Sequence, residues 1–235
     1  MRGGRAPAVQ VIRLYNPPVT VTVKRSARAR KLTLRVAVGT GDITLTAPVS
    51  TSDTELSRFL TAKAGWIEAR RDALPDCIEP NPGDVLTLFG EDVTLQAAKG
   101  RRVKRQGTTL LVPGDDELFR ARLKNWIKQQ ARQAATSACD KYSAALGLRY
   151  KRLSVRDPRS RWGSCTSEGH VMMSWRLAFA PVHVLEYVAA HEVAHLRELN
   201  HSAAFWETVA RLMPEFESPR GWLKSHGPEL HAIRL

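Results

Sequence analysis

The chain of 235 residues has few cysteines and no long apolar run. Cys77, Cys139 and Cys165 are odd in number, widely separated and form no CxxC pair, which argues against a disulfide framework and a cysteine-type zinc site. No segment approaches 18 apolar residues, and residues 1–14 contain no apolar signal segment, so neither a membrane span nor a signal peptide is expected. These absences favour a reducing compartment, and we expect a cytoplasmic protein without membrane partners.

Acidic residues are scarce relative to basic ones: 36 Lys and Arg against 23 Asp and Glu give a net charge of +13. This excess favours anionic partners such as nucleotides or nucleic acid, although it also suits a self-repelling, soluble surface. The charge is +7 for residues 1–115, from 18 basic and 11 acidic residues, and +6 for the remainder, from 18 and 12. Because no basic arm carries the excess, the nucleic-acid interpretation is weakened.

Residues 1–115 are typical of a small β-rich module with one helix. Alternating or β-branched segments predict strands at 19–23, 31–38, 43–46, 85–89, 93–95 and 109–112. The first three are expected to form a meander whose last turn contains Gly39 and Gly41. Ser52 and Glu55 form a capping box that opens a helix to about residue 74. The module holds no cluster of ligand-type residues, so we expect it to serve as scaffold, cover or substrate selector.

Residues 116–235 are expected to form a second domain of α+β type. A helical run from 116 to 146 closes at Gly147, and strands are predicted at 153–155 and 171–176. A further helix follows Pro181, which suits a first helical turn. Its apolar positions recur at three- and four-residue spacing: Leu185, Val188, Ala189, Val193, Leu196 and Leu199.

That helix carries the residues from which we predict a metal site. His191 and His195 lie one turn apart on the same face, so both rings can reach one divalent ion. Glu192 is placed to act on water bound to that ion. Asn200 is expected to end the helix in the left-handed conformation, which leaves His201 just beyond it as a third ligand. Three fixed residues match by chance in about one chain in a hundred, so the prediction depends on this context.

The segment 159–165 and the strand that follows it are expected to flank the metal. Small residues and a glycine indicate a strand and turn where backbone approaches another group closely, and an edge strand there could pair with an extended peptide. Arg161 and Arg176 could hold a substrate carboxylate or phosphate, or pair with acidic neighbours such as Glu186. Tyr187, one turn before His191, is either an oxyanion donor or a core residue.

Taken together, these residues resemble the YgjP-like metallopeptidase family, whose core is related to SprT-like zincins. The matching pattern comprises Arg159-x-Arg161-Trp162-Gly163-Ser164-Cys165, Trp175-Arg176-Leu177, Pro181, Tyr187-Val188, His191-Glu192-x-x-His195-Leu196, Asn200-His201-Ser202, Phe205-Trp206 and Trp222-Leu223. The N-terminal part is similar at Arg30–Val38 and around Lys63 and Gly65-Trp66-Ile67. The resemblance implies a zincin-like catalytic core within 116–235, zinc held by three histidines, and Glu192 as catalytic acid/base.

The leading hypothesis is therefore a zinc-dependent hydrolase, most simply a metallopeptidase using a metal-activated water with Glu192 as general base. Its substrate would be a peptide or protein. A nucleoside triphosphate pyrophosphatase with the same Zn²⁺ site is an alternative that suits the net charge. A DNA-associated protease or binding protein is a third hypothesis, expected to show affinity that falls steeply with salt.

Overall fold

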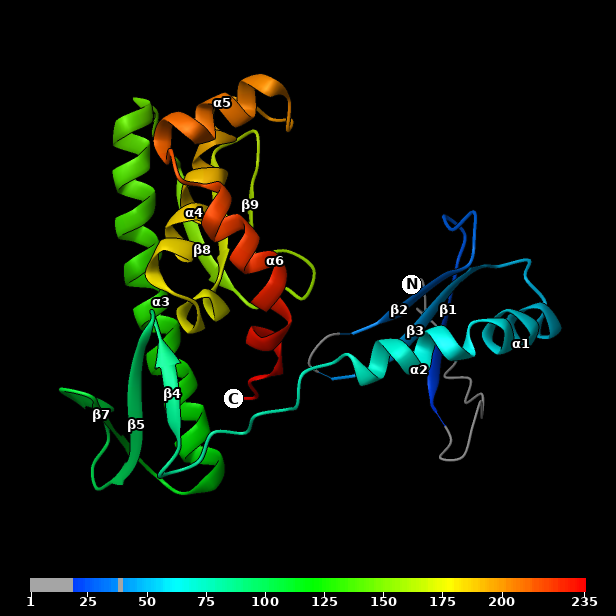
Figure 1. Cartoon of the computed structure of the whole chain (residues 1–235), viewed down its shortest axis with the longest axis horizontal. Coiled ribbons are helices and arrows are strands. Elements are labelled where there is room, and N and C mark those ends of the chain that lie inside the picture. Colours follow the sequence, from blue (N-terminus) through cyan, green and yellow to red (C-terminus); the bar gives the residue numbers. More distant parts are fainter. Residues whose placement is uncertain (1–18, 38–39) are drawn as a thin grey trace, which may run out of the picture. The chain divides into compact units, whose positions relative to one another are not determined.

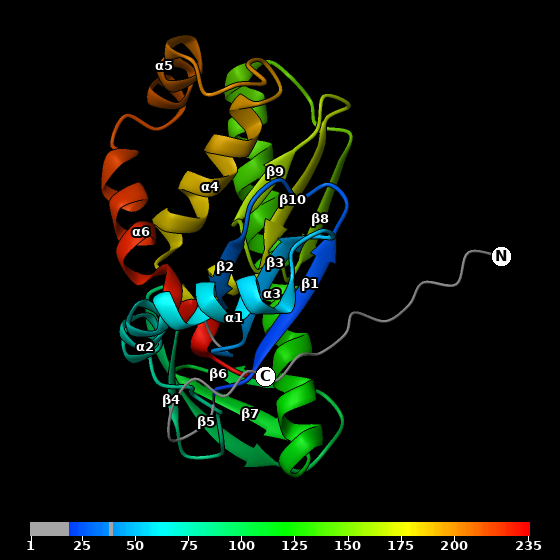
Figure 2. The same ribbon diagram turned by 90° about the vertical axis from the view of Figure 1, so that its right-hand side faces the viewer.

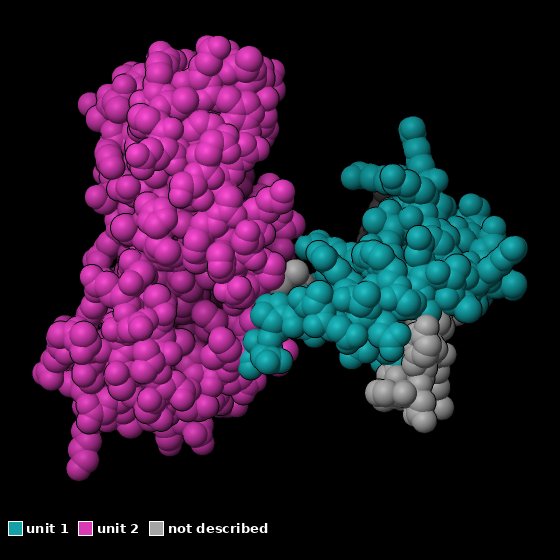
Figure 3. Space-filling view, in the orientation of Figure 1, with its two compact units in different colours: residues 1–77 teal, residues 78–235 magenta. Residues whose placement is uncertain are grey.

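The computed structural model describes residues 19–37 and 40–235, and the chain divides by contacts into two compact units, Met1–Cys77 and Ile78–Leu235. Figures 1 and 2 show the ribbon in two views, and Figure 3 shows the two units in different colours. Both units mix helices with small sheets, which makes the chain α+β as predicted. The expectations for residues 1–14 and for the turn at Gly39 lie outside the described residues.

Unit 1 contains a three-stranded sheet and two short helices. Its elements are β1 (Val21–Ser26), β2 (Thr33–Val36), β3 (Ile43–Pro48), α1 (Asp53–Ala62) and α2 (Ala64–Asp72). The predicted capping box is present, because the Ser52 hydroxyl accepts from the Glu55 amide and the Glu55 carboxylate accepts from the Ser52 amide. The single predicted helix is interrupted at Lys63, which caps α1 and precedes α2.

The predicted meander is wrong in one respect. β2 and β3 form the expected antiparallel hairpin, but β1 pairs in parallel with β3, so the strand order is β1-β3-β2. Alternation along β1 predicts that one face is buried, and Val21 and Val23 are indeed buried. It carries no information about which neighbouring strand completes the ladder.

Unit 2 is built along one long helix. Its elements are β4 (Val85–Leu88), β5 (Glu91–Ala98), β6 (Lys104–Gln106), β7 (Thr109–Pro113), α3 (Asp116–Leu146), β8 (Arg152–Arg156), β9 (Gly163–Cys165), β10 (His170–Ser174), the 3₁₀ helix η1 (Trp175–Phe179), α4 (Val182–Ala194), α5 (Ala203–Leu212) and α6 (Glu217–Ala232). α3 has the predicted bounds and ends at Gly147 with φ of 71°. Figure 1 shows β4, β5 and β7 near one end of α3, and β8, β9, α4 and α5 toward the other.

The structural units divide at a different place from the boundary expected at residue 115. The sheet β4-β5-β7-β6 shares one apolar core with α3, η1 and α4. The turn between β4 and β5 lies against η1, which leads into α4, because the Phe89 amide donates to the Ala178 carbonyl at 2.7 Å. A Cβ added to Gly90, at φ of 87°, would lie 3.6 Å from Pro181 Cα. The predicted strands at 85–89, 93–95 and 109–112 thus belong to the same compact unit as the histidines.

The second sheet of unit 2 packs against α4, the helix that carries His191 and Glu192. Its order is β8-β10-β9, with β10 parallel to β8 and antiparallel to β9. β9 is therefore an edge strand, as expected, and it packs against α4. Among the described residues, no helix is long and apolar enough to cross a membrane.

Candidate metal centre

Three histidines converge at the end of α4. Their candidate ligand nitrogens all lie within 4.8 Å of one another, and Nε2 of His201 lies 3.0 Å from Nε2 of His191. Nitrogens about 2.1 Å from a tetrahedral ion are about 3.4 Å apart, so small ring movements would satisfy one ion. His195, His191 and His201 are respectively buried, half-buried and exposed, which leaves one side of the group open.

The helix ends earlier than the sequence predicts. α4 stops at Ala194 with His195 as its cap, and Asn200 is not among the described non-glycine residues of positive φ. The expectation that a left-handed Asn200 terminates the helix is therefore wrong. Leu199, predicted to be buried, is 63% exposed because it lies in the loop beyond the helix. His201 is nevertheless brought back to the site by this loop and by Ser202, the N-cap of α5.

Neighbouring groups set the orientation of each imidazole. Nδ1 of His195 lies 2.9 Å from the Glu198 carbonyl, so this nitrogen carries the proton and donates, leaving Nε2 free for a metal. Phe205 contacts all three rings, with centroids at 4.9 Å from His191, 4.5 Å from His195 and 4.7 Å from His201. The sequence predicts Phe205 only as a core residue. Its four-residue separation from His201 across the N-cap is the one signal that could have indicated this role.

His191 and His195 are held in the form that can bind a metal. Burial, together with the neighbouring His195 and His201, lowers the pKa of His191 to about 3. Burial also lowers the pKa of His195, against the hydrogen bond to Glu198. A neutral imidazole has the free lone pair that a ligand needs, so the donor set fits a divalent ion such as zinc.

Glu192 lies beside the histidines in a tight enclosure. It is only 5% exposed, and burial raises its pKa to about 8 against the opposing charge of Arg161. A Cβ added to Gly163 on β9 would lie 2.6 Å from Cγ and 2.7 Å from Cδ of Glu192. The expectation of a close backbone approach near residue 163 is thus confirmed, and its partner is the carboxylate side chain.

Of the three predicted substrate-binding residues, Arg161 and Tyr187 lie at the candidate site and Arg176 does not. Arg161 and Tyr187 line the same small cavity as His191 and Glu192. Arg176 instead donates from Nε to Asp157 at 2.7 Å and from Nη1 to the Leu230 and Ile233 carbonyls at 2.9 and 2.8 Å. These contacts occupy the guanidinium with structural partners. Glu186, named as a possible partner of the arginines, pairs with Lys141 at 3.1 Å.

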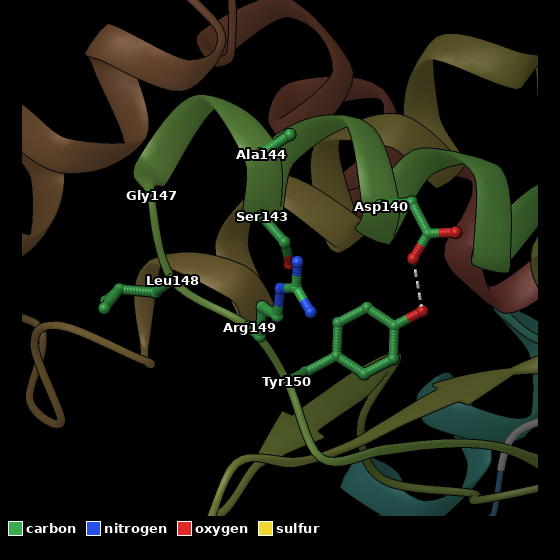
Figure 4. Close-up of a pocket in the computed structure, with 7 residues that line it drawn as sticks. All are labelled: Asp140, Ser143, Ala144, Gly147, Leu148, Arg149 and Tyr150. Carbon is green, nitrogen blue, oxygen red and sulfur yellow. Dashed lines mark hydrogen bonds between the residues drawn. The ribbon is translucent and has the colours of Figure 1, made fainter.

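A larger cavity, of about 580 Å³, lies away from this group at the C-terminal end of α3. Figure 4 shows it between the last turns of α3 and the segment Gly147–Tyr150, with the Tyr150 hydroxyl donating to Asp140 at 2.6 Å. None of the seven residues lining it is a histidine or a cysteine. Its size alone therefore does not make it a catalytic site.

The three histidines thus form a group that could hold a metal ion beside a buried glutamate, and comparison with known proteins gives the class of the protein. Residues 30–226 match the family model described as YgjP-like, metallopeptidase domain. The protein is therefore a metallopeptidase-type protein. More particularly, it belongs to the YgjP-like family, since the match covers well over half of the chain.

Two further comparisons give little more. The chain is similar, at 16% identity and a TM-score of 0.36, to the crystal structure of the metallopeptidase zymogen of Pyrococcus abyssi abylysin. The similarity covers 39% of this chain and 92% of that one. None of the curated proteins matches the chain.

Proposed function

We propose that the protein is a zinc-dependent peptidase in which His191, His195 and His201 hold the ion and Glu192 is the general base. The observation that carries this proposal is the convergence of three imidazoles, with their candidate ligand nitrogens within 4.8 Å of one another, beside a buried carboxyl group. Such a set leaves a coordination position for water, as in catalytic rather than structural sites. Each of these residues lies within 116–235, which we retain as the proposed zincin-like catalytic domain.

Zinc, when bound, supplies Lewis acidity that polarises a carbonyl and makes water more acidic. Burial favours the protonated form of Glu192, but the positive charge of a bound ion would favour the carboxylate. Glu192 would then take a proton from the attacking water and return it to the amine that leaves. Its enclosure by Gly163 holds the carboxylate in one position and excludes bulk water from one side. Burial raises the pKa of Tyr187 above its ordinary value, so its hydroxyl keeps its proton and is available as a hydrogen-bond donor to the oxyanion.

The substrate chain would lie along β9. β9 is an edge strand, and an extended peptide can add to such an edge through main-chain hydrogen bonds. Arg161 would hold a polar group of the substrate at the entrance. Arg176 is not included as a substrate ligand, because its contacts with Asp157 and the α6 carbonyls support a structural role.

Glu192→Gln tests the assignment. The amide keeps the size of the side chain but cannot accept a proton, so we expect unchanged zinc content and a loss of casein cleavage by at least about 100-fold. A variant that loses zinc together with activity would contradict the role given to Glu192. Tyr187→Phe, which removes only the hydroxyl, serves as a matched test of the donor.

A nucleotide substrate remains the second candidate because of one feature. A cavity of about 440 Å³ on the outer face of the β8-β10-β9 sheet is lined by Arg156, Arg161 and His170, among others. This group could bind phosphates, and Arg161 also lines the small cavity that contains His191 and Glu192. Incubation of the zinc-loaded protein with nucleoside triphosphates and with casein separates the two candidates, since only one should be consumed. A DNA-associated role is tested by binding to duplex DNA at low salt.

A further inference from the structure

A small cavity opens directly beside the catalytic carboxylate. It has a volume of about 210 Å³ and is lined by Arg161, Trp162, Gly163, Tyr187, Val188, His191, Glu192 and Leu223. One wall is therefore formed by His191 and Glu192, the proposed metal ligand and general base. Most of the remaining surface is aromatic or aliphatic and comes from three separate elements: the segment leading into β9, α4 and α6.

The aromatic wall is held in place by the C-terminal helix. The Trp162 indole stacks on the His231 ring with centroids 4.7 Å apart and an interplanar angle of 29°. A Cβ added to Gly227 would lie 3.1 Å from Cζ2 of the indole, so the glycine allows the ring to lie flat against α6. A cavity wall fixed on two sides is pre-formed, which lowers the cost of binding.

Leu223 closes the cavity from α6. The side chain is 8% exposed and belongs to the apolar core of unit 2. It lines the cavity together with Tyr187 and Val188, which lie in the middle of α4, one turn before His191. Leu223 is the lining residue that α6 contributes, so a smaller side chain at position 223 would enlarge the cavity on this side.

The size of the cavity indicates what it can hold. Sites for whole small molecules usually enclose about 300–1,000 Å³, so 210 Å³ is too small for a nucleotide and suits one side chain of a longer chain. An ionised side chain would lose its hydration against Trp162, Val188 and Leu223, whereas an apolar one would gain from burial. Arg161 is exposed and lies at the rim, where it also lines the neighbouring cavity.

We propose that this cavity binds one apolar side chain of the peptide substrate, next to the bond that is cleaved, and that Leu223 sets the largest side chain accepted. The proposal rests on the proposed peptidase function, because it assigns the neighbouring residue of the same substrate. Complete burial of a leucine or phenylalanine side chain corresponds to roughly a 10- to 100-fold preference over a small or charged one.

Binding is measured separately from cleavage, in zinc-loaded Glu192→Gln protein, by titration calorimetry with capped peptides that differ at one central position. The peptides carry Ala, Leu, Phe or Asp at that position. We expect Leu to bind about 10-fold more tightly than Ala and Asp. Adding Leu223→Ala should enlarge the cavity and improve the Phe-to-Leu affinity ratio by about 5- to 10-fold.

Leu230→Ala is the matched control, since Leu230 is a buried leucine of the same helix that does not line the cavity. It should leave the Phe-to-Leu ratio unchanged. Leu223→Val gives a milder enlargement should the alanine variant fail to fold. The proposal would be overturned if all four peptides bound with equal affinity or if the Asp peptide bound most tightly. It would also be overturned if neither Leu223 variant changed the Phe-to-Leu affinity ratio. If the affinity ratios are as expected but the native protein, which keeps Glu192, cleaves none of the peptides, only the peptidase function is contradicted.

Discussion

Gly163 leaves room for the carboxyl group of Glu192, and no larger residue would. Gly163→Ala places a methyl group 2.6 Å from Cγ of Glu192, so the catalytic side chain has to move while the imidazoles stay in place. A displacement of about 1 Å costs roughly 100-fold in rate, and we expect kcat to fall by about that factor with zinc content unchanged. Gly221→Ala is the control, because a Cβ at Gly221 meets nothing within 4 Å. Full activity of Gly163→Ala would show that the enclosure is unimportant.

The ion pair between Asp157 and Arg176 gives a second prediction at this scale, now for stability. Burial raises the pKa of Asp157, but the hydrogen bond and charge of Arg176 outweigh it, and the net pKa lies below its ordinary value of 3.8. A lowered pKa means that the stabilisation is complete well above pH 3.8 and is lost as the pH falls through the still lower folded-state value.

Asp157→Asn should therefore lower Tm at pH 7 and have less effect as the pH falls below 3.8. The cost at pH 7 is about 1 kcal/mol, because the carboxylate is 37% exposed and screened by solvent. Thermal unfolding of both proteins between pH 7 and pH 3 measures the difference. A gap that widens on acidification would contradict the assignment.

At this scale, the sequence predicts which side chains form the candidate metal site better than it predicts the long-range contacts of individual residues. The spacing of His191, Glu192 and His195 is local, so helical geometry alone places them together. The contact of Arg176 with Asp157 joins residues 19 positions apart, and its contacts with the carbonyls of Leu230 and Ile233 span more than 50. No local pattern specifies such long-range partners, which is why the sequence leaves both a substrate role and an ion pair open for Arg176.

At the scale of elements, the N-cap of α5 is expected both to stabilise this helix and to position His201, a proposed metal ligand. The Ser202 hydroxyl accepts from the Phe205 amide at 3.4 Å, and His201 directly precedes this cap. Ser202→Ala should cost about 1 kcal/mol in unfolding free energy and also release His201, which we expect to weaken zinc binding by about 10-fold.

Ser52→Ala provides the comparison, since it removes the N-cap of α1 in unit 1. It should lower the stability of unit 1 and leave zinc affinity unchanged in a competitive chelator titration. Equal zinc affinity in both variants would show that the cap does not position His201.

Elements with local signals were predictable, and those that depend on distant partners were not. The long α3 that ends at Gly147 and the capping box at Ser52 follow from cap chemistry close in sequence. The parallel pairing of β1 with β3 and the early end of α4 depend on packing. The apolar spacing along residues 116–146 also places Leu118 on the buried face of the helix, but Leu118 is 46% exposed while Phe119 beside it is buried.

For the whole molecule, the two compact units have separate apolar cores. Val21, Leu45 and Leu60 belong to the core of unit 1, whereas Leu123 and Phe205 belong to that of unit 2. Pro113 and Gly114 precede a long helix, which is why the sequence places a domain boundary at residue 115, and this boundary stays a prediction for the catalytic domain. β7 contacts α3 and β4 contacts η1, so these strands belong to the same compact unit as the helices that follow.

Zinc should therefore stabilise one unit and not the other. A ligand that binds only the folded form, at 100 times its Kd, slows exchange through unfolding by about 100-fold. Hydrogen exchange followed by mass spectrometry should show this slowing in α4 and α5 and no change in β1, β3 and α1. Equal protection of both units would indicate that they unfold together.

The central claim is that three imidazoles hold one metal ion, and elemental analysis of protein purified without added metal tests it most directly. We predict about one zinc per chain in the native protein and in Glu192→Gln, and almost none in His195→Ala, with His226→Ala as the control that keeps its metal. Native protein without any divalent metal after zinc reconstitution, or His195→Ala with a full complement, would contradict the account.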